Sequence, residues 1–185
     1  MDVELPPEFE SKLAEVKKQY PQSRSAIMPA LYLAQQHFGH LREDAIRWVA
    51  ARLDLPPVHV MEVASFYTMY YKKPVGQYHV QVCRTLSCAV RGAQELTNCL
   101  KKRFATKAHE ATADGIWSYE EVECLGSCGT APMVQINDFY FENLNPEKLE
   151  ALLDRIEKER PELRLSSVTD AMPEGLSGCP KSEVI

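Results

Sequence analysis

Long hydrophobic runs are missing from this 185-residue sequence. No stretch approaches the roughly 18 to 20 consecutive apolar residues that a membrane-spanning helix needs. The first residues, Met1 to Glu8, are acidic and include Pro6 and Pro7, whereas a secretory signal starts with basic residues followed by an apolar segment. We therefore expect a cytoplasmic protein that has no cleaved leader and does not insert directly into a membrane.

Basic clusters and nucleotide-binding glycine loops are also missing. The 21 Lys and Arg residues are outnumbered by 26 Asp and Glu, and the few basic pairs are scattered along the chain. This distribution argues against a nucleic-acid-binding surface. Neither the Gly-x-Gly-x-x-Gly motif nor the Gly-x-x-x-x-Gly-Lys-Ser/Thr motif occurs. We expect no nucleic-acid partner and no dinucleotide bound by this chain alone.

The sequence does contain the make-up of an ordinary globular protein, with 45% hydrophobic and 25% charged residues. Its first half predicts helices separated by prolines. Apolar residues recur at helical spacing in residues 8–20, 24–38 and 44–53, and again after Pro56 and Pro57. Gly39 is suited to the left-handed position that ends a helix. Residues 1–73 therefore predict an N-terminal helical bundle.

The second half of the chain changes from helical to extended patterns. Predicted strands cover residues 78–82, 116–122, 133–136 and 139–142, and predicted helices cover 89–104 and a segment that Asn145 caps, with Pro146 as its first residue. This order predicts a small domain with one mixed four-stranded sheet over residues 77–160, and an α+β, α/β-like protein as a whole. The Ser-, Pro- and Glu-rich residues 161–185 predict an extended or partner-bound tail.

Two cysteine pairs are the strongest chemical signal. Cys83 and Cys88 have four residues between them, and Cys124 and Cys128 have three. Each pair follows a predicted strand, so two strands of one sheet could deliver four thiolates to one point. Four thiolates are what a 2Fe-2S cluster requires. A structural zinc site with four cysteines is chemically possible as well, whereas disulfides would need an oxidising compartment.

The surroundings of these pairs favour a cluster. Gly126 and Gly129 flank Cys128 and leave space for backbone N–H groups to approach sulfide, while Ser87, Ser127 and Thr130 offer hydroxyl groups. The predicted helix that begins just after Cys88 would direct the positive end of its dipole towards the thiolates. Cys99 and Cys179 have no thiol neighbour close in sequence, and we expect neither to be a ligand.

At this point the sequence resembles a known family. The segments Val-Cys-Arg-Thr-Leu-Ser-Cys, around Cys83, and Glu-Cys-Leu-Gly-Ser-Cys-Gly-Thr-Ala-Pro, around Cys124, resemble the thioredoxin-like 2Fe-2S ferredoxins. More closely they resemble the E-type subunit family of NADH-quinone oxidoreductase, the counterparts of the 24 kDa subunit of complex I. The resemblance extends over roughly residues 8–158 and includes Ser25-Ala-Ile-Met-Pro-Ala-Leu, Val60-Met-Glu-Val-Ala-Ser-Phe-Tyr-Thr-Met-Tyr and Ile136-Asn-Asp.

The resemblance implies a thioredoxin-like ferredoxin domain that holds one 2Fe-2S cluster through Cys83, Cys88, Cys124 and Cys128. It implies a partner subunit of F type that binds FMN and NADH, and a place in the peripheral arm of a respiratory complex on the cytoplasmic face of the inner membrane. The chain would then carry single electrons without turnover residues of its own. The equivalent diaphorase subunit of an NAD-reducing hydrogenase or an NAD-dependent formate dehydrogenase, and a zinc-stabilised interaction module, remain alternatives.

Two further groups of residues carry a functional and a structural interpretation. The aromatic and Met residues from Met61 to Tyr71 predict core packing, although some could seat a partner subunit. The acidic run Glu120, Glu121 and Glu123 would lower the reduction potential of a nearby cluster, because negative charge disfavours adding an electron. Its alternative is an exposed strand face.

Overall fold

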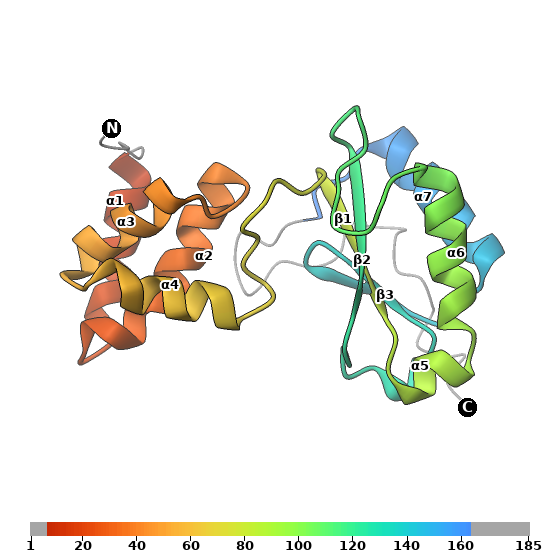
Figure 1. The fold of residues 1–185 in the computed structure, drawn as a ribbon, viewed down its shortest axis with the longest axis horizontal. Helices are drawn as coiled ribbons and strands as arrows, with labels where there is room; N and C mark the ends of the chain where they lie inside the picture. The colour runs from red at the N-terminus through yellow and green to blue at the C-terminus, as the bar shows by residue number, and fades with distance from the viewer. Residues whose placement is uncertain (1–6, 164–185) are drawn as a thin grey trace. The chain divides into compact units, whose positions relative to one another are not determined.

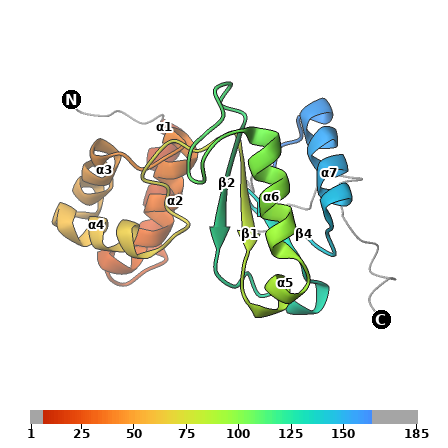
Figure 2. The same cartoon turned by 45° about the vertical axis from the view of Figure 1, so that its right-hand side comes forward.

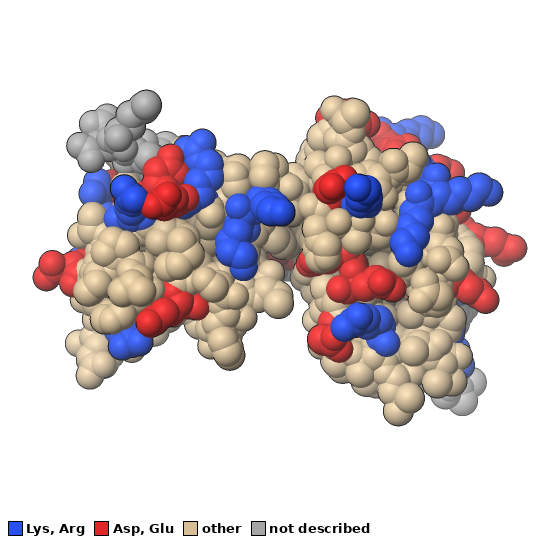
Figure 3. All heavy atoms as spheres, in the orientation of Figure 1, with Lys and Arg blue, Asp and Glu red and all other residues tan. Residues whose placement is uncertain are grey.

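A computed structural model of the chain describes residues 7–163 (Figure 1). The chain forms two compact units, one ending at Pro74 and the other beginning at Val75. Each unit has a hydrophobic core of its own. Within residues 7–163, none of the helices has the length and apolar character needed to cross a membrane. Acidic and basic side chains are interspersed over the face of each unit shown in Figure 3.

The first unit is helical, as the sequence predicts. Its elements are α1 (Pro7–Lys18), the 3-10 turn η1 (Ser23–Ala26), α2 (Ile27–Phe38), α3 (Glu43–Leu53) and α4 (Pro57–Phe66). Helix α2 starts three residues later than the spacing predicts, because η1 forms the preceding turn. It ends where predicted, since Gly39 has a φ of 73° and its N–H bonds the carbonyl of Gln35.

The core of this unit is formed by the inward faces of its helices, including Leu31, Ile46 and Val60. The aromatic segment after α4 divides between core and surface. Tyr70 is buried and its hydroxyl donates to the Met28 carbonyl, which fits the packing interpretation. Phe66 is 79% exposed, so core packing is wrong for that ring; Phe66 lies at the last turn of α4, where the chain turns out of the helix.

The second unit is built on a mixed sheet. Its strands are β1 (Tyr78–Cys83), β2 (Trp117–Val122), β3 (Val134–Ile136) and β4 (Phe139–Phe141), in the spatial order β2-β1-β3-β4. Strands β1 and β2 are parallel, with Cys83 opposite Val122, and the remaining pairings are antiparallel. Asn137, at a φ of 53°, and Asp138 make the tight turn between β3 and β4. The predicted four-stranded mixed sheet is confirmed.

Three helices accompany the sheet: α5 (Leu86–Val90), α6 (Ala93–Phe104) and α7 (Pro146–Glu159). The single predicted helix over residues 89–104 is wrong. Gly92 adopts a φ of 97° and breaks it into α5 and α6. The start of α7 is as predicted, because the Asn145 side chain accepts the Lys148 N–H at 2.8 Å. Figure 2 shows α6 and α7 on the same face of the sheet.

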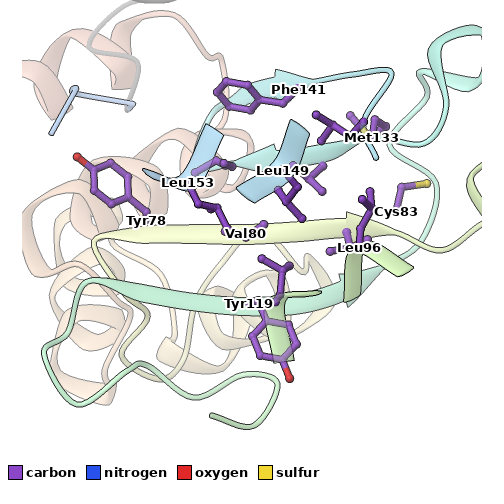
Figure 4. Packing of buried hydrophobic residues seen from close by; sticks show 14 of the residues in the cluster. Tyr78, Val80, Cys83, Leu96, Tyr119, Met133, Phe141, Leu149 and Leu153 are labelled. Carbon is purple, nitrogen blue, oxygen red and sulfur yellow. The ribbon is translucent and has the colours of Figure 1, made fainter. Parts of the chain in front are cut away.

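The core of the second unit lies between the sheet and these two helices. Val80 of β1, Leu96 of α6 and Leu149 and Leu153 of α7 are fully buried in it. Figure 4 shows Cys83 at the end of β1, beside this cluster. The core therefore reaches the first cysteine. Of the predicted tail, residues 164–185 lie outside the described part of the chain; Leu163 is buried against the sheet unit, and its carbonyl accepts the Asp138 N–H at 3.2 Å.

The other face of the sheet carries polar side chains that satisfy one another. His79 is buried and lies 2.7 Å from the Ser118 hydroxyl and 3.1 Å from the Glu120 carboxylate. Gln81 donates to the same carboxylate at 2.7 Å, and His109 contacts its second oxygen at 2.9 Å. Burial alone would raise the pKa of Glu120, but the hydrogen bonds from His79 and Gln81 outweigh burial and lower it.

Candidate metal centre

The ends of β1 and β2 bring the two cysteine pairs to one edge of the sheet. Cys83 is the last residue of β1, and Cys124 follows the end of β2 by two residues. Because these strands are parallel neighbours, their carboxyl ends leave the sheet side by side. The shared edge expected from the sequence is therefore present.

The first pair is buried. Cys83 closes β1, and Cys88 lies inside α5, three residues after its N-cap Thr85. The prediction that a helix begins after Cys88 is therefore wrong, and α5 is only five residues long. Cys88 thus occupies a fixed position on a helical turn rather than on a loose loop.

The two buried thiols differ in acidity. Burial raises the pKa of the Cys83 thiol, but the backbone N–H groups of Leu125 and Thr85 donate to its sulfur and bring the pKa below its usual value. Burial also raises the pKa of Cys88, and the hydrogen bond with Cys83 adds to this rise. The pKa of Cys83 is therefore lowered and that of Cys88 raised relative to an ordinary thiol.

The second pair is exposed. Cys124 lies in the loop after β2, and Cys128 begins the 3-10 turn η2 (Cys128–Thr130). The N–H of Gly126 donates to the Cys124 sulfur at 3.4 Å, and Gly126 has a φ of 86°. The left-handed backbone at Gly126 directs this N–H at the sulfur, so a glycine is favoured there.

The two loops leave the sheet from neighbouring parallel strands, because Cys83 closes β1 and Cys124 follows β2 by two residues. That all four thiols bind one metal centre stays a prediction. Within residues 7–163, no three Cys, His, Asp or Glu side chains are grouped closely enough to hold a single metal ion.

The donor set and the space around it fit a cluster of two irons and two sulfides. Such a cluster takes two thiolates on each iron, so it needs two pairs and not three donors around one ion. A Cβ placed on Gly126 or Gly129 would meet nothing within 4 Å, which leaves open space on both sides of Cys128. Soft thiolates, backbone N–H donors and open space beside them fit a 2Fe-2S group.

Strand β4 and the residues after it hold the second loop. The Tyr140 hydroxyl donates to the Leu125 carbonyl at 2.9 Å. Backbone bonds join the Asn143 N–H to the Thr130 carbonyl at 2.8 Å and the Leu144 N–H to the Pro132 carbonyl at 3.0 Å. The exposed cysteines are therefore positioned by hydrogen bonds from an edge strand.

Glu142, directly after β4, is the residue of this site that sequence reasoning misses. Its Oε1 atom accepts hydrogen bonds from the hydroxyls of Ser127 and Thr130, the latter at 2.6 Å. These two hydroxyls, expected to be offered to sulfide, are thus bonded to a carboxylate instead. No local sequence pattern indicates the bonds from Ser127 and Thr130 to Glu142, because the pairing of β3 with β4 is what brings Glu142 to this loop.

Cys99 and the acidic run have protein partners of their own. Cys99 of α6 donates its thiol to the Glu150 carboxylate at 3.1 Å, and burial, with this bond, raises its pKa to about 11. In the acidic run, Glu121 accepts from the Thr97 hydroxyl and Glu123 pairs with Arg84. Of these two acids, Glu123 is thus paired with a positive charge, whereas Glu121 is hydrogen-bonded to a neutral hydroxyl. Cys179 lies outside the described residues.

Comparison with known proteins bears directly on this arrangement. The sequence model of the thioredoxin-like 2Fe-2S ferredoxins matches residues 13–157. The chain belongs to the thioredoxin-like 2Fe-2S ferredoxin family. Two relatives of this ferredoxin-family chain are named as the E-type subunit of NADH-quinone oxidoreductase. The protein of Rickettsia bellii (strain RML369-C) is 46% identical over 148 residues, which cover 78% of this chain and 89% of the relative.

The second of these relatives, from Rickettsia prowazekii (strain Madrid E), is 46% identical over 147 residues, which cover 77% of this chain and 83% of the relative. Among solved structures, this ferredoxin-family chain is similar to a chain of the NAD+-reducing NiFe hydrogenase in the H2-reduced state. That match has a TM-score of 0.62 and 25% identity, and covers 71% of this chain and 22% of the hydrogenase chain. The present chain thus spans about a fifth of that chain.

Proposed function

We propose that this chain is the electron-carrying subunit of an NADH:quinone oxidoreductase. It would hold one 2Fe-2S cluster through Cys83, Cys88, Cys124 and Cys128 and exchange single electrons with the FMN of a partner subunit that binds NADH. The observation that carries the proposal is that the two cysteine pairs follow the carboxyl ends of β1 and β2, which are parallel neighbours in the sheet. The two Rickettsia relatives, by their names, support the same function.

The residues of the site divide the work of holding the cluster. Cys83 and Cys88 would anchor it from the buried side, where the N–H groups of Leu125 and Thr85 stabilise negative charge on sulfur. Cys124 and Cys128 would hold it from the exposed side, where Gly126 directs its N–H at sulfur. When bound, a 2Fe-2S cluster supplies reversible one-electron transfer. An exposed ligand pair leaves a short path to a docked redox partner.

In this proposal, residues 77–160 would be the ferredoxin domain that holds the cluster, and the helical unit that ends at Pro74 would be a separate part of the subunit. A partner-bound tail remains a prediction for the residues after Leu163. The ferredoxin domain supplies no turnover residues, because FMN and NADH bind to the F-type partner. The chain would lie in the peripheral arm of the complex, on the cytoplasmic face of the membrane. No described helix could anchor it there directly, so the partner subunits would hold it in place.

A second candidate is the equivalent diaphorase subunit of an NAD-reducing hydrogenase. The similarity to a chain of the NAD+-reducing NiFe hydrogenase, at a TM-score of 0.62, favours it. The site chemistry is the same in both candidates, because the same four thiols would hold the same kind of one-electron cluster. An NAD-dependent formate dehydrogenase would again use this module. The identity of the chains that bind this one separates these functions.

A zinc-stabilised interaction module is less well supported. A structural zinc ion would use the same four thiols. The family model that matches residues 13–157 describes 2Fe-2S ferredoxins and therefore favours the cluster.

The test is to purify the tagged chain anaerobically from its own cells with the chains that bind it. We expect a flavin-containing chain to copurify and NADH to produce an EPR signal of a reduced 2Fe-2S cluster. The matched control is the Cys124→Ser, Cys128→Ser double variant, which would lose that signal while the flavin chain's own NADH oxidation persists. A chain that purifies without flavin or iron and contains one zinc would contradict the proposal. Copurified hydrogenase or formate dehydrogenase chains would support the second candidate.

A further inference from the structure

The carboxylate of Glu142 bonds two residues that flank Cys128. The hydroxyls of Ser127 and Thr130 both donate to one atom, Glu142 Oε1, with the Thr130 bond at 2.6 Å. The same two hydroxyls lie 2.7 Å from each other. Glu142 therefore ties together the residue before Cys128 and the residue that ends its 3-10 turn.

The turn around Cys128 is held mainly by hydrogen bonds. None of the residues of η2 (Cys128–Thr130) is buried, so the hydrophobic core that fixes Cys83 does not reach it. Backbone bonds join the Thr130 N–H to the Ser127 carbonyl at 3.3 Å and the Asn143 N–H to the Thr130 carbonyl at 2.8 Å. Hydrogen bonds to a charged acceptor are roughly twice as strong as those between neutral groups. The two bonds to Glu142 are therefore a substantial side-chain restraint on this turn.

We propose that Glu142 is a positioning residue for the metal centre. By holding Ser127 and Thr130, it fixes the backbone on both sides of Cys128 and so the position from which this thiol would bind the cluster. Loss of this restraint lets the Cys128 turn move away and exposes iron to solvent. This inference rests on the proposed function, because it assumes that the four thiols hold a 2Fe-2S cluster. It assigns to Glu142 the kinetic retention of that cluster.

The hydrogen-bond pattern allows the acceptor oxygen of Glu142 to be tested separately from its negative charge. Both hydroxyls use the same oxygen of Glu142, and a glutamine offers one such oxygen in the same place. Glu142→Gln should therefore keep the turn in position, whereas Glu142→Ala removes the acceptor. Thr130→Val removes one of the two donors with little change in shape. Glu147→Ala, at an exposed residue of the first turn of α7, is the matched control for loss of a nearby carboxylate.

The experiment measures how fast the purified, cluster-loaded full chain releases iron to a strong chelator under anaerobic conditions. We expect Glu142→Ala to release iron about 10-fold faster than the parent, since a lost hydrogen bond to a charged group corresponds to roughly one decade in an equilibrium. Thr130→Val should release iron at a rate between those of the parent and Glu142→Ala. Glu142→Gln and Glu147→Ala should stay within about twofold of the parent. The EPR spectrum of the reduced protein should change in Glu142→Ala and return to the parent form in Glu142→Gln.

Three outcomes would overturn the inference. Iron release at the parent rate in both Glu142→Ala and Thr130→Val would show that these hydrogen bonds do not help to retain the cluster. Equal acceleration in Glu142→Gln and Glu142→Ala would show that the acceptor oxygen is not what matters. If Glu147→Ala accelerated iron release as much as Glu142→Ala, the effect would come from the loss of any nearby negative charge and not from the hydrogen bonds of Glu142. If Glu142→Ala fails to fold, Thr130→Val alone decides between acceleration and none. Failure of the proposed function is recognised separately, because the parent chain would then contain no iron, and the inference would fall with it.

Discussion

The two cysteine pairs occupy opposite environments within one unit. Cys83 and Cys88 are buried, at the end of a central strand and inside a helical turn, while Cys124 and Cys128 lie exposed in a loop. The buried pair is fixed by the core between the sheet and α6. The exposed pair is fixed by hydrogen bonds from Tyr140, Glu142 and the backbone after β4.

This difference separates two requirements of a metal centre. Burial makes the position of the first pair part of the stability of the whole unit, because a buried group cannot move without disturbing the core. The second pair can be exchanged or displaced at little cost to the fold. A site built in this way can hold its cluster firmly on one side and leave the other side open to a redox partner.

The largest expected effect comes from removing one thiol of each pair. Cys88→Ala and Cys128→Ala should both lower iron content at least about 10-fold, since a 2Fe-2S cluster takes four thiolates. The metal-free proteins should differ: Cys88→Ala should lose about 1 to 3 kcal/mol of unfolding free energy and Cys128→Ala about 0.5 kcal/mol or less. Iron assay and urea denaturation measure the two quantities. Full iron content in either variant would contradict the ligand set.

The next largest effect is expected from a substitution in the hydrophobic core of the sheet unit. Leu96 is fully buried in the same core cluster as Cys83 (Figure 4), and Leu96→Ala should cost about 2 to 5 kcal/mol of unfolding free energy. Leu86 of α5 is 75% exposed, so Leu86→Ala is the matched control and should change stability by about 0.5 kcal/mol or less. Thermal or urea unfolding of the metal-free chain compares them. Equal losses would mean that α5 packs more tightly than its exposure indicates.

A smaller effect separates the two glycines beside Cys128. Gly126 has a φ of 86°, which costs an L-residue about 1 to 2 kcal/mol, whereas Gly129 has no such constraint and both face open space. In the metal-free protein, Gly126→Ala should lower the unfolding free energy by that amount. Gly129→Ala should leave it within about 0.5 kcal/mol. Similar losses at both positions would refute the backbone argument.

The smallest effect concerns pH and the polar face of the sheet. The pKa of Glu120 lies below its usual value of 4.5 because hydrogen bonds from His79 and Gln81 outweigh its burial. A lowered pKa favours folding above the unfolded pKa, and this contribution disappears as the pH falls through the folded value. The stability difference between the parent and Glu120→Gln should therefore be positive at about pH 7 and shrink below about pH 4.5. Urea unfolding across this range measures it, with Glu95→Gln, on the exposed face of α6, as the control.

A stability difference that stays constant from neutral to acidic pH would contradict this account of Glu120. The same result in Glu95→Gln as in Glu120→Gln would assign the effect to overall charge instead of to the contacts with His79 and Gln81.

Local sequence patterns were sufficient to predict the elements whose signals are local. Gly39 ends α2 and Asn145 caps α7 because each needs only its own neighbours. The mixed sheet followed from the order of the predicted strands and helices. The break at Gly92 was missed, because a helical pattern on both sides of one glycine looks continuous in sequence.

Long-range contacts explain what the sequence could not provide. The exposed position of Phe66 and the contacts of Glu120 with His79 depend on which surfaces pack, and periodicity does not report this. Glu142 escaped prediction for the same reason, since its partners lie across a turn and a strand pairing. The four cysteines stood out because their spacing is itself the chemical signal.

The most direct test of the central claim is the metal content of the anaerobically purified chain, with iron, zinc and acid-labile sulfide assayed on one sample and EPR recorded before and after reduction with dithionite. The account predicts a red-brown protein with about two irons and two sulfides per chain and an EPR signal that arises only on reduction. A colourless protein with one zinc and no sulfide, unchanged after attempted cluster reconstitution, would contradict it.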